Sequence, residues 1–327
     1  MGFEERIHPE LREGLALYEA LGLGRKDLSG DAIPAIRATA AEFFASAMAD
    51  IPPNDRVARE DRVATGPDGD VPVRIYRPAD ADGALPALVW LHGGGMIMGD
   101  LDMEDLACDG YAEAVGCVVV SVDYRLAPEH PHPAPVEDCY AVLTWVAEHA
   151  SELGVDPDRI AVGGASAGGG LAAGTVLMAR DRGGPRVVLQ LLMYPMLDDR
   201  DATPSTHEFA GILSWGREHN VSGWRALLGD RVGGEDVDHY AAPARTTDLS
   251  GLPPALIQVG ELEVFRDEDV DYAVRLLRAG VPTELHVYPG AFHAWDLVAP
   301  QARTSVRMIE ERLEALRGAL HPQTAAV

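Results

Sequence analysis

A serine stands between two glycines at Gly164-Ala165-Ser166-Ala167-Gly168, which is a G-x-S-x-G pattern. The apolar run Ile160–Gly163 before it is typical of a buried strand, and the Leu- and Ala-rich run Gly168–Met178 after it is typical of a helix. At such a junction the pattern predicts a tight turn that presents Ser166 as a nucleophile, with no room for side chains two residues to either side. The alternative is a glycine-rich turn with an idle serine.

A second glycine-rich stretch could stabilise the negative charge that an attacking serine creates. His92 and three glycines follow the apolar run Ala87–Leu91, and a glycine backbone can turn its N–H groups toward one point. The amides of Gly93 and Gly94, together with that of Ala167, are therefore expected to form an oxyanion hole. A phosphate-binding loop is the alternative, but the sequence contains no G-x-x-x-x-G-K-[ST] pattern.

A serine hydroxyl is a weak nucleophile without a base to remove its proton. Of the eleven histidines, His293 lies in the loop after the predicted strand Glu284–Tyr288, whereas His286 lies inside that strand. A nucleophile of this kind is usually followed along the chain by its acid and then by its histidine. His293 is therefore the predicted general base.

The base needs a carboxylate that orients the imidazole and stabilises its charged form. Four acidic residues lie in the stretch 260–268, directly after the predicted strand Ala255–Val259. Glu263 lies just beyond the strand and is the expected acid, with Asp267 as the alternative. Asp267 and Glu268 are expected to cap the following helix.

The remaining pattern predicts the elements that must position these residues, because strands and helices alternate from residue 85 onward. Such alternation is typical of an α/β fold with a mostly parallel sheet and helices on both faces. A hairpin is predicted from Val57–Ala64 and Val71–Arg77, and two helices from Pro9–Gly22 and Ile33–Met48. Further strands are expected at Ala87–Leu91, Cys117–Val122, Ile160–Gly163, Val187–Met193, Ala255–Val259 and Glu284–Tyr288, and further helices at Met103–Val115, Pro135–His149, Ser166–Arg180, Glu268–Ala279 and Gln301–Leu316.

One interval, residues 197–252, breaks the alternation: it has no strand pattern but several aromatic residues. We interpret it as a helical insertion that joins the N-terminal helices of residues 1–55 as a cap, because long interruptions of compact domains are usually functional. Residues 56–196 and 253–320 would then form the catalytic domain. A peripheral helical pair on the side of the sheet is the alternative.

Composition restricts the class of partner. The net charge of −25 argues against nucleic acid and against anionic membranes, both of which would repel this surface. No run is long and apolar enough to span a membrane, and no apolar signal segment is evident, so a cytoplasmic location is expected. The three cysteines lack metal-binding spacing and are expected to be buried and reduced, and no metal is predicted.

Taken together, the motifs resemble a known family. His92–Gly95, Asp123–Pro131, Gly164–Gly169 and Gly290–His293 are similar, in this order, to motifs of the hormone-sensitive-lipase family of carboxylesterases in the α/β-hydrolase superfamily. The resemblance covers roughly residues 57–318. It implies an eight-stranded sheet whose second strand is antiparallel, a helical cap, and hydrolysis of short- to medium-chain acyl esters without a cofactor.

The resemblance also implies a homodimer through the last strand and its neighbouring helix. Two positions differ from the family pattern: Glu263 stands where Asp is usual, and Ala165 stands where Asp is common. Asp123 and Arg125 are expected to pair and to brace loops beneath the site. Walls of the acyl or alcohol pocket are expected from Met96, Phe209, Trp215 and Trp224, with the core of the cap as the alternative place for its aromatic residues.

Two other functions remain open on the sequence. The same catalytic groups could serve a related acyl hydrolase acting on thioesters, lactones or amides. A non-catalytic binding protein of this fold is a further alternative, which the presence of both Ser166 and His293 disfavours.

Overall fold

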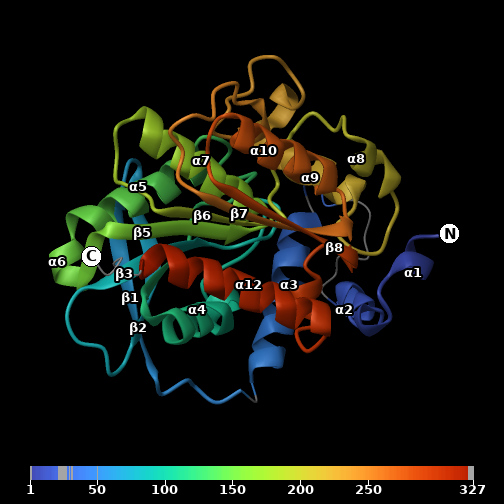
Figure 1. Ribbon diagram of the computed structural model, residues 1–327. Coiled ribbons are helices and arrows are strands. Elements are labelled where there is room, and N and C mark those ends of the chain that lie inside the picture. Colours follow the sequence, from blue (N-terminus) through green and yellow to red (C-terminus); the bar gives the residue numbers. More distant parts are fainter. Residues whose placement is uncertain (1, 21–27, 29, 31, 50, 323–327) are drawn as a thin grey trace.

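One eight-stranded sheet forms the centre of the computed structural model, which describes residues 2–20, 28, 30, 32–49 and 51–322 (Figure 1). The strand order is β1-β2-β4-β3-β5-β6-β7-β8. The strands are β1 Val57–Gly66, β2 Gly69–Pro78, β3 Leu85–Leu91, β4 Val118–Val122, β5 Val155–Ala165, β6 Leu189–Met193, β7 Ala255–Leu262 and β8 Thr283–Phe292. Every predicted strand is present, and the ends of several extend beyond the predicted bounds.

The sheet is parallel from β4 through β3 to β8, and the hairpin adds its two antiparallel strands at one edge. β1 pairs with β2 from Val57↔Pro78 to Gly66↔Gly69, and β2 pairs antiparallel with β4. The central strands are buried on both faces: all five residues of β4, which are four valines and Ser121, are buried. The predicted α/β-hydrolase architecture with an antiparallel second strand is confirmed. Its parallel strands bring their carboxyl ends to one edge, where ligands bind in such folds.

Helices cover both faces of this sheet (Figure 1). α4 and α12 lie on one face, and α5, α7 and α10 lie on the other. Within the described residues, no helix has the length and apolar character needed to cross a membrane. The helical segments that accompany the parallel strands are η2 Asp102–Glu104, α4 Asp105–Tyr111, the π-helical turn η3 Ala112–Gly116, α5 Ala134–Glu148, α6 Ala150–Leu153, α7 Ala167–Asp181, α10 Arg266–Arg278, α11 Trp295–Val298 and α12 Arg303–Leu320.

Two further helical regions lie outside the strand–helix alternation. The N-terminal region contains α1 Phe3–Arg6, η1 Pro9–Leu11, α2 Leu15–Ala20 and α3 Ala32–Met48. The predicted helix from Pro9 is therefore divided in two, and its last residues, Leu21 and Gly22, lie outside the described residues. Residues 197–252 contain α8 Pro204–Glu208, α9 Arg217–Leu228, η4 Gly229–Arg231 and η5 Pro243–Arg245 and no strand, as predicted.

The side chain of Arg125 braces the loops below the sheet edge in a way that differs from the prediction. Its guanidinium binds the buried Asp138 of α5 through Nε and NH2, each at 2.8 Å, and reaches Asp68 at 3.3 Å. The predicted pair with Asp123 is therefore wrong, because the guanidinium is directed to α5. Cys108, Cys117 and Cys139 are all free and buried, as predicted.

Candidate active site

Ser166 lies at the turn between β5 and α7, and two glycines make that turn possible. A Cβ on Gly168 would overlap the carbonyl oxygen of Leu91, and a Cβ on Gly164 would overlap the backbone of Gly168. Ser166 itself has φ 57° and ψ −119°, a conformation that costs a non-glycine residue free energy. The tight turn predicted from the G-x-S-x-G pattern is present.

The structure brings Ser166, His293 and Glu263 together in one hydrogen-bonded row. His293 Nε2 lies 2.9 Å from Ser166 Oγ, and His293 Nδ1 lies 3.2 Å from Glu263 Oε1. The other Glu263 oxygen accepts the amide of Gly260 at 3.2 Å. All three side chains are buried, and that of Glu263 is fully so. These distances suit proton transfer from the hydroxyl to an imidazole that a carboxylate orients.

Asp267, the alternative acid, faces a different part of the molecule. Its carboxylate accepts the amide of Ser205 at 2.7 Å and pairs with Arg266 at 2.8 Å, and these contacts lower its pKa against the opposing effect of burial. Glu268 accepts the amides of Leu197 and Asp198. Both residues lie in the first turn of α10, as predicted, but the helix has no side-chain capping hydrogen bond: the two carboxylates bind the chain at α8 and at the start of the insertion.

The His92–Gly95 loop lies beside the serine. A Cβ on Gly93 would lie 3.5 Å from Ser166 Cβ, so this backbone passes directly next to the nucleophile position. Within the described residues, the amides of Gly93, Gly94 and Ala167 have no protein acceptor. The three amides named from the sequence thus remain available to a bound group near Ser166 Oγ.

The side chain of His92 stabilises this loop. Its Nδ1 donates to the Gly93 carbonyl at 2.8 Å, and its ring stacks on Tyr124 with the ring centres 4.0 Å apart. The Tyr124 hydroxyl donates to the His92 carbonyl at 2.8 Å. Burial lowers the pKa of His92 to about 4, because the charged imidazolium would lose its hydration. His92 is therefore neutral at pH 7 and serves as a structural donor.

Among the predicted pocket residues, Trp215 lies nearest to the catalytic groups. Its ring covers Gly95, where a Cβ would overlap it, and its centre is 6.3 Å from that of the His293 ring. Met96 is fully buried next to this glycine and has φ 66°.

The other two predicted wall residues make different contacts. Phe209 packs between Arg6 and Arg266, whose guanidinium carbons lie 5.8 and 5.5 Å from its ring centre. Trp224 is buried in α9, and no described contact joins its ring to His293 or Ser166. The structure therefore brings Trp215, but neither of these rings, to the imidazole.

Three aromatic residues contact His293 although the sequence patterns did not select them. The ring centres of Tyr194 and Phe265 lie 4.8 and 5.2 Å from that of His293, both edge to face. Tyr18 of α2 donates its hydroxyl to the His293 carbonyl. Tyr194 and Phe265 each follow a predicted strand end, so position relative to the strands could have selected them. Tyr18 carries no such signal.

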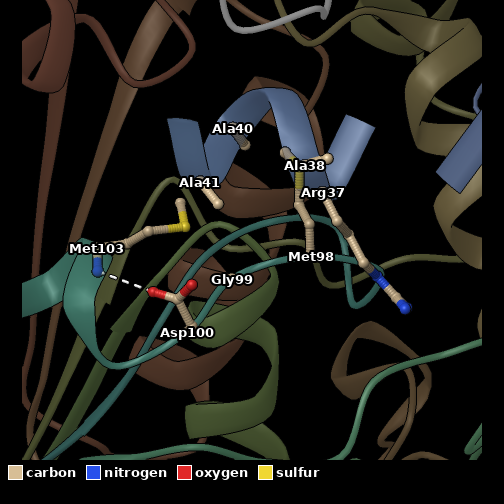
Figure 2. Close-up of a pocket in the computed structure, with 8 residues that line it drawn as sticks. All are labelled: Arg37, Ala38, Ala40, Ala41, Met98, Gly99, Asp100 and Met103. Atoms are coloured by element: carbon tan, nitrogen blue, oxygen red, sulfur yellow. Dashed lines mark hydrogen bonds between the residues drawn. The ribbon is translucent and has the colours of Figure 1, made fainter. Parts of the chain in front are cut away.

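A cavity of about 310 Å³ lies between α3 and the segment that follows the glycine loop (Figure 2). Ser166 and His293 are not among its lining residues. Met98 forms part of its wall, and the same side chain contacts Gly94, since a Cβ there would lie 3.0 Å from Met98 Cγ. Met98 therefore contacts both the cavity and the candidate oxyanion loop. It is lined by Arg37, Ala38, Ala40, Ala41, Met98, Gly99, Asp100 and Met103.

Comparison with known proteins places this architecture among esterases. The family described as alpha/beta hydrolase fold matches residues 88–297. The carboxylesterase NlhH of Mycobacterium tuberculosis is 42% identical over 257 residues, which cover 77% of this chain and 79% of the relative. The ethyl acetate hydrolase of Pseudomonas putida is 33% identical over 318 residues, which cover 94% of this chain and 98% of the relative.

Solved structures agree with these relatives. A structure titled bacterial heroin esterase superposes with a TM-score of 0.90 at 43% identity, covering 97% of this chain and 98% of that one. The fold and the sequence similarity together define an α/β hydrolase. Within this superfamily, the chain belongs to the carboxylesterases of the hormone-sensitive-lipase family.

Proposed function

We propose that this protein is a serine carboxylesterase that hydrolyses short- to medium-chain acyl esters, with Ser166, His293 and Glu263 as its catalytic residues. The observation that carries the proposal is the row of contacts from the serine hydroxyl through the imidazole to the buried carboxylate, at 2.9 and 3.2 Å. The ester substrate is a small molecule, and the reaction needs no cofactor.

In the proposed reaction, His293 Nε2 takes the proton of Ser166 as its oxygen attacks the ester carbonyl carbon. The carbonyl oxygen becomes an anion that accepts hydrogen bonds from the amides of Gly93, Gly94 and Ala167, and each such donor is typically worth about 3 kcal/mol in the transition state. The imidazolium then gives its proton to the leaving alcohol, which leaves an acyl-enzyme. A water molecule, deprotonated by the same imidazole, releases the acid.

Two helical regions, residues 1–55 and 197–252, form the cap in this proposal, and residues 56–196 and 253–320 form the catalytic domain. The contacts between the two regions support it: the rings of Phe3 and Phe209 meet edge to face at 6.2 Å, and Arg6 pairs with Glu208 at 2.6 Å. Trp215 supports a confined acyl site, because its buried ring lies over Gly95 and near His293. We assign Met96 to the same wall.

Substitution of the serine tests the proposal. Ser166→Ala should fold normally and lose at least about 10⁴-fold of the p-nitrophenyl butyrate hydrolysis, because the attacking oxygen is removed. The matched control is Ser305→Ala, which removes another buried hydroxyl, one with no hydrogen-bond partner among the described residues. A fluorophosphonate probe should label the wild type and S305A but not S166A. Substantial turnover by folded S166A would overturn the assignment.

We further propose a homodimer through β8 and α12. β8 is an edge strand of the sheet, and unpaired edges can associate with a second chain. Val287 of β8 and Val306 of α12 support this face, since 41% and 39% of their surfaces are exposed. Light scattering after gel filtration should give twice the chain mass, and V287R should return the protein to a monomer.

A cytoplasmic location completes the proposal. Three free, buried cysteines support it, because reducing compartments keep thiols unpaired. Fractionation of the source cells, with immunodetection of each fraction, tests this location.

A further inference from the structure

The N-terminal segment, residues 3–18, packs against the loop that carries His293, almost three hundred residues later (Figure 1). The amide of His8 donates to the Gly290 carbonyl at 3.0 Å, and a Cβ on Gly290 would lie only 2.7 Å from His8 N. A Cβ on Gly14 would lie 3.0 Å from the carbonyl oxygen of Val298. The two chain segments thus touch through their backbones on both sides of His293.

Tyr18 makes the central contact of this packing. Its hydroxyl donates to the His293 carbonyl, and its ring meets Phe292 edge to face at 5.9 Å. The side chain is buried. Burial, together with the nearby charges of Glu263 and Asp296, raises its pKa well above the usual range. The hydroxyl therefore stays protonated and remains a donor at every working pH.

The bonded carbonyl belongs to a strained part of the backbone. The next residue, Ala294, has φ 52° and ψ 34°, a left-handed conformation that is unfavourable for a residue with a Cβ. Such a conformation persists where the surrounding structure holds it, and contacts to the peptide between His293 and Ala294 contribute to this. Tyr18 supplies one such contact on the carbonyl side, at the residue whose imidazole must reach Ser166 Oγ.

We propose that Tyr18 is a positioning residue for the general base: its hydroxyl fixes the 293–294 peptide, so that the imidazole meets Ser166 only when the N-terminal segment is seated on the loop. The inference rests on the proposed function. In this inference the N-terminal segment contributes to catalysis by orienting the general base, which is a different role from lining the substrate pocket. Tyr18 contacts the main-chain carbonyl of His293 and not its imidazole, so it takes no part in proton transfer.

Tyr18→Phe tests the inference, because it removes the hydroxyl and keeps the ring against Phe292. One lost neutral hydrogen bond at the base should lower kcat about three- to tenfold. KM should be unchanged, and the factor should be equal for acetate, butyrate and hexanoate esters. The rate of fluorophosphonate labelling should fall by the same factor. The matched control is Tyr272→Phe in α10, whose buried hydroxyl has no partner among the described residues; it should keep the wild-type kcat.

The labelling rate follows the reaction of competent molecules only, so a lower yield of folded Y18F does not affect it. An unchanged kcat and labelling rate in Y18F would overturn the inference, as would a loss confined to KM or one that varied with acyl length. A loss that varied with acyl length would assign Tyr18 to the substrate pocket. Failure of the proposed function itself is recognised separately, because S166A would then retain turnover whatever Y18F does.

Discussion

The two glycine-rich turns beside Ser166 differ in the contacts that hold them in place. At Gly164–Gly168, main chain presses on main chain, and the Ser166 amide donates to the Met193 carbonyl at 2.8 Å. The His92–Gly95 loop has backbone contacts of its own, from Gly94 to Met98, and is held in addition by side chains, since Tyr124 binds the His92 carbonyl and Trp215 covers Gly95. Both turns exclude a Cβ, since one on Gly94 would overlap the Met98 carbonyl oxygen, but the second turn also depends on side chains that support it.

This difference determines which substitutions each turn tolerates. When a methyl group is added to a turn that is fixed by backbone contact, the whole turn is disrupted, because neither backbone segment can move without moving a strand. A loop fixed by side chains loses its supports one at a time, and one of those supports, His92, can be protonated. Three substitutions separate these behaviours.

The largest effect is expected from Gly168→Ala. The added Cβ would overlap the carbonyl oxygens of Leu91 and His92, so β3 and α7 could not both keep their places. We expect a loss of more than about 4 kcal/mol in the free energy of unfolding and no detectable esterase activity. Urea denaturation followed by circular dichroism gives the first value.

The control for this substitution is Gly318→Ala, at a helical glycine of α12 where, apart from the neighbouring residues and the backbone of its own helix, no atom lies within 4 Å of the added Cβ. It should stabilise the protein by about 0.5–1 kcal/mol. A G168A protein as stable as the wild type would show that the turn adapts, and would remove the contrast between the two regions.

The next effect concerns pH. His92 has a pKa of about 4 in the folded protein and an ordinary value of 6.5, so the unfolded chain binds the extra proton between these values. The contribution of His92 to stability is complete above pH 6.5 and falls as the pH decreases toward 4. The loss should reach about 2 kcal/mol at pH 5.

His92→Asn isolates this contribution, since an amide can still donate to the Gly93 carbonyl but does not titrate. The free energies of unfolding of wild type and H92N should be measured at pH 7.5 and pH 5. The wild type should lose about 2 kcal/mol more than the variant over this range. Equal losses would mean that the buried imidazole plays no part in the pH dependence of the loop.

The smallest effect is expected from Tyr124→Phe. The ring still stacks on His92, but the hydrogen bond to the His92 carbonyl is lost, at a cost of about 1 kcal/mol. Thermal unfolding should detect the change. A loss as large as that of G168A would contradict the view that the loop has several independent supports.

Much of the fold could be predicted because its signals are local. Alternating strands and helices, the hairpin and the strand ends that carry Ser166, Glu263 and His293 all follow from short-range apolar patterns and glycine placement. Where the backbone has no room for a Cβ, the sequence must contain glycine. The turn at Ser166 could therefore be predicted from the sequence.

Contacts between distant side chains left no comparable signal. Arg125 binds Asp138 rather than Asp123, and the carboxylates of Asp267 and Glu268 bind the insertion rather than cap α10. Each of these partners lies at least 13 positions away along the chain, and only the packing of the helices brings it to the side chain. The role of Tyr18 could not be predicted either, because its hydrogen-bond acceptor is the main-chain carbonyl of a residue 275 positions away.

The distance along the chain between Tyr18 and His293 also bears on biosynthesis. The two residues are 275 positions apart, and a ribosome adds about 5–20 residues per second. The first helices therefore wait for tens of seconds, at the slower rates, before the surface that they cover has been made. Tyr18 is thus made long before the main-chain carbonyl that its hydroxyl binds, and the contact between them forms only after residue 293 has been added.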